Sequence, residues 1–168
     1  MPAPERLPLA LYVHLPWCVR KCPYCDFNSY TQDGAIPEEA YVDALLADRD
    51  ADLRYAAGRS LVSVFFGGGT PSLFSGAAVT RLLDGIRARL PLAADAEITL
   101  EANPGAVDAA HFAAYRRAGV NRLSIGVQSF RPAQLASLGR VHDVADIGRA
   151  VATARDAGFD NFNLDLMH

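Results

Sequence analysis

Long apolar runs are missing from this sequence of 168 residues. No run approaches the roughly 18 to 20 residues that cross a bilayer, so we expect no integral membrane segment. The first 16 residues, MPAPERLPLALYVHLP, also lack a basic stretch followed by a continuous apolar one, because Glu5, Arg6 and several prolines interrupt them. This beginning is unlike a secretory signal, and we therefore expect the protein to lie in a reducing cytoplasm.

An excess of basic residues is missing too. Lys and Arg together number 16 and Asp and Glu 19, which gives a formal net charge of −3. A surface that neutralises phosphates needs clustered positive charge, so the composition does not favour nucleic acid as a partner. With 51% hydrophobic and 21% charged residues, the chain should form one ordinary globular core, as one domain or part of one.

Cysteine is scarce. The chain has three, Cys18, Cys22 and Cys25, and all fall within the stretch HLPWCVRKCPYCDFNSY. An odd number at such close spacing argues against a disulfide framework, since one thiol would be left over and the closed loops would be tiny. The pattern is instead typical of metal or cluster ligands.

Three explanations of this cysteine loop can be weighed. A C-x3-C-x2-C loop can supply three thiolates to a 4Fe–4S cluster, which leaves the fourth iron open to a cofactor that carries an amine and a carboxylate. Zinc could take the same three thiolates and a histidine such as His14. Simple packing of small buried residues is a third explanation, but Lys21, Pro23 and Asp26 lie in the same loop. We favour the cluster.

Strand and helix patterns alternate along the chain. Short runs rich in β-branched and aromatic residues predict buried strands at 9–15, 61–67, 97–102, 122–127 and 162–167. Helical patterns lie between them at 38–57, 77–90, 108–118 and 143–157. This alternation favours a parallel sheet with right-handed crossovers, either doubly wound or closing into a barrel.

Unusual residues follow the predicted strands. The cysteine loop comes after the first, GGGTPS after the second, and EANPG and GVQSF end the third and fourth. Ligands of parallel α/β sheets gather at the carboxyl ends of the strands, so we expect these segments to meet at one site. The chain stops at NLDLMH, on an apolar strand, and we expect it to be a fragment of a longer protein.

The stretch YVHLPWCVRKCPYCDFNS carries a family resemblance. It resembles the signature of radical S-adenosylmethionine (SAM) proteins, and among them the branch of oxygen-independent coproporphyrinogen III oxidases and HemW heme chaperones. The cysteine spacing and the aromatic Tyr24 just before the third cysteine carry the likeness, which extends over nearly the whole chain. It implies a partial (β/α) barrel of about five parallel strands with intervening helices, truncated at its C-terminus. Residues 1–168 would then be the N-terminal part of a radical SAM core.

The resemblance also implies a ligand set. Cys18, Cys22 and Cys25 would hold a 4Fe–4S cluster, and SAM would bind its free iron. The residues implied for SAM are Tyr12, Tyr24, Gly68, Gly69, Thr70, Glu101, Gln128, Arg140 and Asp165. In this reading the glycine turn meets the amino group of SAM, the guanidinium pairs with its carboxylate, and Asp165 accepts from a ribose hydroxyl.

From the residues alone, other roles stay open for several of these positions. The glycines could simply make a tight turn, Glu101 could cap the next turn, and Gln128 and Arg140 could be solvated surface. His14 is expected to shape the cysteine loop rather than to bind metal. No catalytic residue is assigned.

One departure from the oxidase pattern separates two functions. Members of the resembled oxidase branch carry a further cysteine two positions after the third ligand, where this sequence has Phe27. The resemblance therefore favours a heme chaperone, which binds heme as cargo, passes it to acceptor hemoproteins and needs an electron donor. The alternatives are a coproporphyrinogen III oxidase, which decarboxylates propionate side chains to vinyls, and a zinc-stabilised structural module. His142 and His168 are heme ligands by residue type only, and neither is assigned.

Overall fold

The computed structural model describes residues 7–106 and 108–168. Within these residues the main sheet has five strands: β1 (Leu9–Leu15), β4 (Leu61–Gly68), β5 (Leu92–Ala102), β6 (Arg122–Gln128) and β7 (Phe162–Leu166). Their order in the sheet is β1-β4-β5-β6-β7, and every neighbouring pair is parallel. The order in space thus follows the order in the chain.

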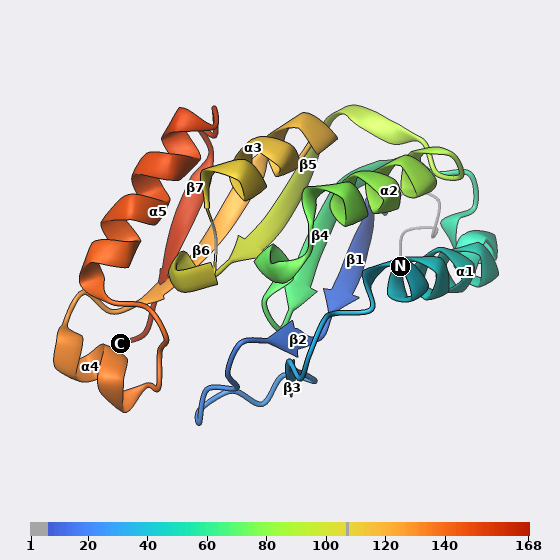
Figure 1. Ribbon diagram of the computed structural model, residues 1–168. Helices are drawn as coiled ribbons and strands as arrows, with labels where there is room; N and C mark the ends of the chain where they lie inside the picture. Colours follow the sequence, from blue (N-terminus) through green and yellow to red (C-terminus); the bar gives the residue numbers. More distant parts are fainter. Residues whose placement is uncertain (1–6, 107) are drawn as a thin grey trace.

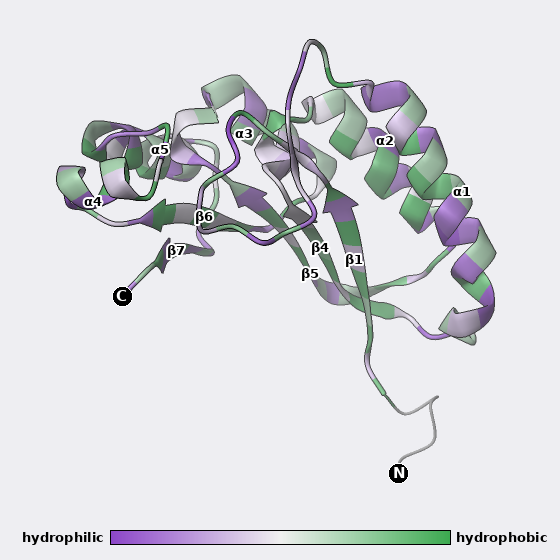
Figure 2. Cartoon of the chain, turned by 90° about the horizontal axis from the view of Figure 1, so that it is seen from below, coloured by the Kyte–Doolittle hydropathy of each residue, from purple (hydrophilic) through white to green (hydrophobic). Residues whose placement is uncertain are grey.

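The helices that connect these strands lie on one face of the sheet (Figure 1). They are α1 (Glu38–Ala56), α2 (Gly76–Arg87), α3 (Ala109–Ala118) and α5 (Val144–Asp156). Each packs beside the next, α1 on α2, α2 on α3 and α3 on α5, so that they form one outer arc around the sheet (Figure 2). A doubly wound sheet would reverse its strand order and carry helices on both faces. The fold is therefore a partial barrel, as the resemblance implied.

The alternation of side chains along each strand separates two faces. In register across the sheet, Phe66, Leu100 and Leu123 all point toward the helices and are fully buried. Their neighbours Thr99 and Glu101 point the other way, beside Arg122 and Ser124. The helix-covered face is consequently the hydrophobic core, and the inner face is polar.

Most predicted element ends agree with the structure to within a few residues. Ser75, Asp108 and Asp143 cap α2, α3 and α5 by accepting a backbone N–H through their side chains, which is why these helices begin there. β5 starts at Leu92, five residues before the predicted 97. Its first residues are alanines and an aspartate without strand character, and pairing of Leu92 with Leu61 extends the strand.

Short elements were not predicted. They are β2 (Trp17–Cys18), β3 (Tyr30–Thr31), α4 (Pro132–Ser137) and the 3-10 turns η2 (Pro71–Leu73) and η3 (Pro104–Ala106). Two to six residues are too few to show a hydrophobic period. β2 pairs with β3 in parallel and thereby closes the base of the cysteine loop. Among the residues described, no helix combines the length and apolar character needed to cross a membrane.

Candidate functional site

A cavity of about 350 Å³ lies at the carboxyl ends of the strands, under the cysteine loop. We call it the strand-end cavity. The predicted residues that line it are Cys18, Cys22, Tyr24, Cys25, Gly68, Gly69, Thr70, Glu101, Gln128, Arg140 and Asp165. Segments up to about 150 positions apart in the chain meet here because parallel strands end at the same edge of the sheet. Every predicted site residue except Tyr12 therefore lines this one cavity.

The cysteine loop is held by its own lysine. Lys21 Nζ donates to the carbonyl oxygens of Phe27 at 3.0 Å and Ser29 at 3.2 Å, and so joins the two sides of the loop. The Cys25 amide donates to the Cys22 carbonyl oxygen at 3.1 Å and forms a turn between these cysteines. Cys18 is buried while Cys22 and Cys25 are half-buried, and all three are free thiols.

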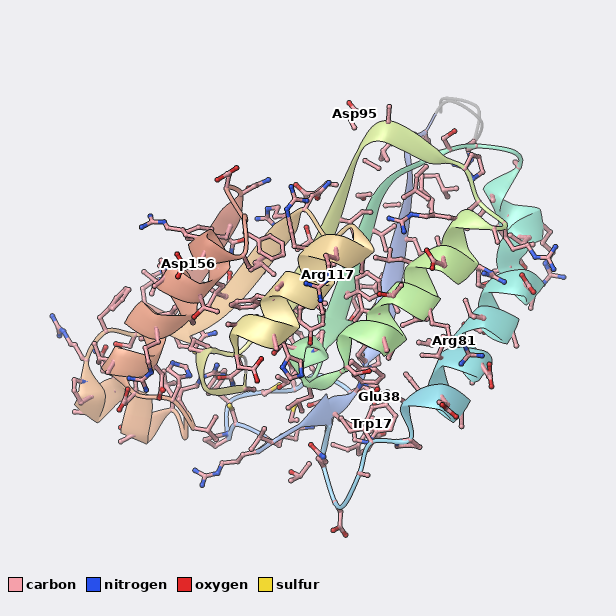
Figure 3. The ribbon with its side chains drawn as sticks, turned by 45° about the horizontal axis from the view of Figure 1, so that its top comes forward. Trp17, Glu38, Arg81, Asp95, Arg117 and Asp156 are labelled. Carbon is pink, nitrogen blue, oxygen red and sulfur yellow. The ribbon has the colours of Figure 1, made fainter. Side chains whose placement is uncertain are left out.

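An aromatic cluster supports the base of this loop. The Trp17 ring meets the Tyr41 ring edge-on at 4.7 Å between centroids, and Tyr41 Oη donates to the His14 carbonyl oxygen at 2.9 Å. Trp17 and Glu38, at the start of α1, lie at the same end of the molecule (Figure 3). The first helix thus fixes the point from which the cysteine loop departs.

His14 is occupied on both ring nitrogens. Nε2 lies 2.8 Å from the Asn28 carbonyl oxygen, and Nδ1 lies 2.9 Å from Tyr12 Oη. Because a carbonyl can only accept, Nε2 carries the proton and Nδ1 accepts from the tyrosine hydroxyl. This arrangement leaves no free lone pair for a metal and supports the prediction that His14 shapes the loop. In the described part of the chain, no three side chains of His, Cys, Asp or Glu are placed to hold one metal ion.

The glycine turn at 67–70 packs directly on the segment that leads into the cysteine loop. Gly68 has φ 120°, and a Cβ there would lie 2.7 Å from the His14 ring. A Cβ on Gly69 would lie 2.5 Å from the Trp17 carbonyl oxygen. Any other residue would push the cysteine loop away, so these glycines serve a close backbone approach as well as a turn.

Three amide groups of this turn, those of Gly68, Gly69 and Thr70, donate inside the protein. Gly68 N–H donates to Glu101 Oε2 at 3.2 Å, Gly69 N–H to the Leu15 carbonyl oxygen at 2.8 Å and Thr70 N–H to that of Trp17 at 2.7 Å. None of the three remains to bind an anion. A ligand with an amino group suits this part of the wall better.

Glu101 places a carboxylate deep in the strand-end cavity. Burial raises the pKa of Glu101 to about 7, the negative charge of Asp165 adds to the rise, and the hydrogen bond from Gly68 opposes it. The carboxyl group is therefore near half ionised at neutral pH. A positively charged or hydrogen-bond-donating ligand would favour its ionised form.

Arg140 reaches into the cavity from the segment between α4 and α5. Nη2 donates to the Gly126 carbonyl oxygen at 2.7 Å, and Nη1 donates to Tyr24 Oη at 3.3 Å and Cys22 Sγ at 3.5 Å. Arg140 Nε is buried without a hydrogen-bond partner. Among the described residues, no other buried side-chain nitrogen or oxygen lacks one. A buried N–H of a cation is costly to leave unpaired, so this guanidinium is suited to an acceptor that the cavity would receive.

Asp165 is held by a polar network on the inner face. Ser124 Oγ donates to Asp165 Oδ2 at 2.9 Å, and Asn163 Nδ2 donates to Asp165 Oδ1 at 2.5 Å. Arg122 donates in turn to Asn163 Oδ1 at 2.5 Å. The orientation of the Asp165 carboxylate is thereby set before any ligand binds.

Gln128 has a backbone conformation that is rare outside glycine. Its φ is 65°, and its carbonyl oxygen accepts from the Met167 amide at 3.0 Å. Such a conformation costs roughly 1 to 2 kcal/mol for an L-residue and commonly marks functional sites. It ends β6 at the cavity wall.

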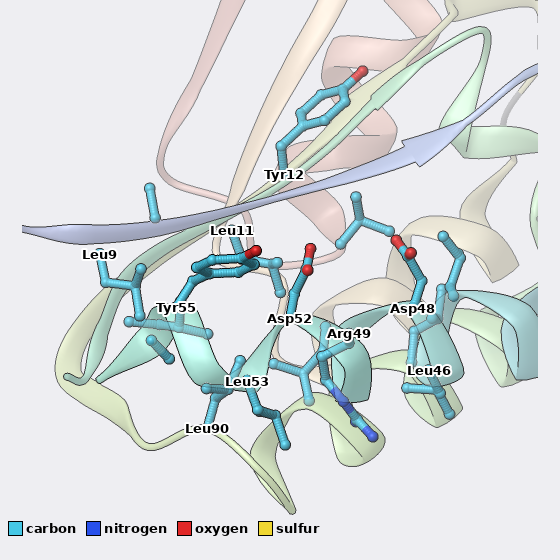
Figure 4. A pocket seen from close by; sticks show the side chains of 17 residues that line it. Leu9, Leu11, Tyr12, Leu46, Asp48, Arg49, Asp52, Leu53, Tyr55 and Leu90 are labelled. Atoms are coloured by element: carbon cyan, nitrogen blue, oxygen red, sulfur yellow. The ribbon is translucent and has the colours of Figure 1, made fainter. Parts of the chain in front are cut away.

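Tyr12 is the predicted site residue that does not line the strand-end cavity. A second cavity, of about 280 Å³, lies between β1, α1 and α2. We call it the apolar groove; its lining includes Leu9, Leu11, Leu46, Leu53, Leu82 and Leu90. Tyr12 borders it but points to the opposite side of β1 (Figure 4). Its ring stacks on Phe65 at 6.3 Å and its hydroxyl contacts His14, so a direct ligand contact stays a prediction.

Sequence reasoning missed several residues of the cavity wall, among them Arg20, Asn103 and Ser124. Ser124 had a usable signal, because it alternates with the apolar residues of the predicted strand at 122–127 and hence faces the inner side. Arg20 and Asn103 lie in irregular segments, where no period indicates direction.

Comparison with protein families and known proteins gives consistent results. The model of the radical SAM superfamily matches residues 12–168. The chain is 60% identical over 161 residues to the heme chaperone HemW of Escherichia coli (strain K12), covering 96% of this chain and 43% of that protein. It is 50% identical over 169 residues to the heme chaperone HemW of Haemophilus influenzae, covering 98% of this chain and 44% of that protein. The chain thus spans less than half the length of these relatives.

A solved structure has the same fold. It is that of coproporphyrinogen III oxidase (HemN) from Escherichia coli, described as a radical SAM enzyme, with a TM-score of 0.87 and 35% sequence identity. The superposition covers 98% of this chain and 38% of the oxidase. The prediction of a likeness to this branch is confirmed.

Proposed function

The chain belongs to the radical SAM superfamily, and we propose that its strand-end cavity holds a 4Fe–4S cluster on Cys18, Cys22 and Cys25 with SAM at the iron they leave free. The observation that carries this proposal is the assembly of all three cysteines and eight of the nine predicted SAM residues around one cavity. Membership of the radical SAM superfamily implies both cofactors, the cluster and SAM.

The residues present fit both groups. Three thiols in one loop are the ligands that an iron–sulfur cluster takes. SAM carries a carboxylate, an ammonium and ribose hydroxyls, and the wall offers a partner for each: the guanidinium of Arg140 with its unpaired Nε, the carboxylate of Glu101 and the pre-oriented carboxylate of Asp165. Both charges of the amino-acid part of SAM would thus be matched.

When bound, the cluster and SAM would supply one-electron reductive chemistry, which belongs to the cofactors. The part of this chain is to bind and orient. Arg140 would take the carboxylate, Asp165 would accept from the ribose, and Glu101 would meet a donor of SAM in its ionised form. Phe27, 57% exposed on the cavity wall, would shield the opening.

For the whole protein we propose a heme chaperone, of which residues 1–168 are the N-terminal part of the radical SAM core. Support comes from identities of 60% and 50% to proteins named heme chaperone HemW. The family resemblance adds Phe27, which occupies the position where the resemblance implies a further cysteine in an oxidase. Heme would be the cargo, acceptor hemoproteins and an electron donor the partners, and the cytoplasm the location.

Coproporphyrinogen III oxidation is the second candidate, because the chain is 35% identical to the structure of that enzyme, which is less than its identity to the HemW proteins. The full-length protein, reconstituted anaerobically, would be titrated with heme and separately incubated with coproporphyrinogen III, SAM and a reductant. We expect saturable heme binding and no decarboxylation. Turnover of the porphyrinogen would overturn the chaperone proposal, and stoichiometric zinc without iron in the isolated protein would overturn the cluster.

A further inference from the structure

His142 fastens the segment that carries Arg140 to the sheet. The side chain is buried, with 3% of the residue exposed. Its Nε2 lies 3.0 Å from the carbonyl oxygen of Val127 in β6, and its Nδ1 lies 3.2 Å from Oδ1 of Asn103, just after β5. One ring therefore touches the carboxyl ends of two neighbouring strands.

The segment itself is short and held at both ends. The Arg140 amide donates to the Leu135 carbonyl oxygen of α4 at 3.0 Å. After His142, Asp143 and Asp146 form a reciprocal capping box that starts α5. Only residues 140–142 lie between these helix contacts, so the place of Arg140 depends on how the connection sits against the strand ends.

The surroundings of His142 are packed and anchored in their own right. A Cβ on Gly105 would lie 3.2 Å from the His142 Cβ, so η3 packs closely against this residue. Asn103 Oδ1 accepts from the Gly105 amide at 3.1 Å, and the Asn103 amide donates to the buried Ser72 Oγ at 3.2 Å. The His142 ring thus packs against a segment whose position is fixed by its own hydrogen bonds.

We propose that His142 is a positioning residue for SAM binding, which holds the guanidinium of Arg140 at the wall of the strand-end cavity by fastening residues 140–142 to the end of β6 through Val127 and by packing against the segment after β5. This inference rests on the proposed binding of SAM in that cavity. A histidine that merely filled the core would affect stability and leave the action of Arg140 unchanged.

The protonation of the ring indicates which variant should preserve this function. Burial lowers the pKa of His142, and the nearby charge of Arg140 lowers it further, so the ring is neutral at pH 7. The Val127 carbonyl oxygen and Asn103 Oδ1 can both only accept, and a neutral ring has one N–H. The shorter contact, 3.0 Å against 3.2 Å, assigns this N–H to Nε2, which donates to Val127, and leaves Nδ1 in contact with Asn103 without a hydrogen bond. Glutamine can place an amide N–H near this position, whereas asparagine is too short to reach it.

The test is a double-mutant cycle on SAM affinity in the full-length protein with its cluster reconstituted, measured by anaerobic calorimetry. We expect Arg140→Ala to weaken binding about 100-fold, as the loss of a charged pair does, and His142→Ala to weaken it about tenfold. The double variant should equal Arg140→Ala within about twofold, because a residue that acts through another has no effect in its absence. His142→Gln should stay within about threefold of the unchanged protein.

A stability control separates positioning from general damage. Phe112→Leu alters a fully buried residue of α3 away from the cavity, and it should lower the melting temperature without changing SAM affinity. Loss of affinity in this control equal to that of His142→Ala would overturn the inference, as would additive effects in the cycle or unchanged affinity of His142→Ala.

Two further outcomes remain interpretable. Should His142→Ala fail to fold, His142→Asn, which loses the bond to Val127, takes its place in the cycle, with the same expected loss. If the unchanged protein binds iron but no SAM, the proposed function itself is contradicted. If it binds SAM with an affinity that does not change in the His142 variants, only this inference is contradicted.

Discussion

The two cavities of this protein are similar in size and opposite in chemistry. The strand-end cavity, about 350 Å³, is lined by thiols, glycines, carboxylates and a guanidinium. Leucine is the commonest residue lining the apolar groove, about 280 Å³, and its charged residues, Asp48, Arg49 and Asp52, all come from α1. Volume alone does not separate them. The separation comes from position at the carboxyl ends of parallel strands and from polar side chains that converge there.

The largest effect should follow from removing a thiol of the strand-end cavity. Cys22→Ala would leave two thiolates for the cluster, and we expect anaerobic reconstitution to yield a protein without the broad visible absorption of a 4Fe–4S cluster. Iron and sulfide content checks this outcome. Full retention of iron in Cys22→Ala would contradict the ligand set.

A substitution in the apolar groove should lower stability without affecting cofactor binding. Leu82 is 1% exposed and lines the groove, so Leu82→Ala should lower the free energy of unfolding by about 2 to 5 kcal/mol. Iron content and SAM affinity of the protein that remains folded should not change. If Leu82→Ala selectively lost SAM affinity, measured below its melting temperature, the two cavities would not have separate roles.

Glu101 should make SAM binding depend on pH. Its pKa of about 7 lies above its ordinary 4.5, so the carboxyl group is protonated at pH 6 and ionised at pH 8. If the ionised form meets SAM, affinity should rise as the pH rises, by at most about tenfold per pH unit below the pKa. Calorimetry across this range checks the slope.

The matched variant is Glu101→Gln, which should flatten this profile. The stability contribution of Glu101 has the opposite sign: because its pKa is raised on folding, the folded state without ligand loses stability as the pH increases from about 4.5 to 7. If the SAM affinity of Glu101→Gln depended on pH as steeply as that of the unchanged protein, the titration would belong to another group.

The smallest effect is expected at Tyr12, which lies between the two cavities. Its hydroxyl reaches the cysteine loop only through His14, so Tyr12→Phe should change SAM affinity less than about threefold. Equilibrium binding measures this. A tenfold loss would indicate the direct contact that the family resemblance implies.

The alternating pattern was enough to predict the sheet and its four long helices, and the strand-end segments placed the cysteine loop, the glycine turn and Glu101 at one site. Arg140 and Asp165 were expected there only from the family resemblance. Strands such as 61–67 are long enough for their side-chain period to show. Ser124 was missed as a partner of Asp165, because a hydrogen bond across neighbouring strands depends on their register, which a single sequence leaves open.

The role of His142 could not be predicted either. In the sequence it is a single histidine two positions after Arg140, and its contacts with Asn103 and Val127 come from segments 39 and 15 positions away. The choice between a doubly wound sheet and a barrel likewise depended on the resemblance, because alternation alone is common to both. Tertiary contacts between irregular segments are the part that local patterns do not encode.

The central claim is that the strand-end cavity holds a cluster with a SAM-accessible iron. The most direct measurement is electron paramagnetic resonance of the anaerobically reconstituted and reduced full-length protein, with and without SAM, alongside metal analysis. We predict about four irons per chain and a cluster signal that changes when SAM is added. A signal that ignores SAM, or a protein that carries zinc in place of iron, would contradict the claim.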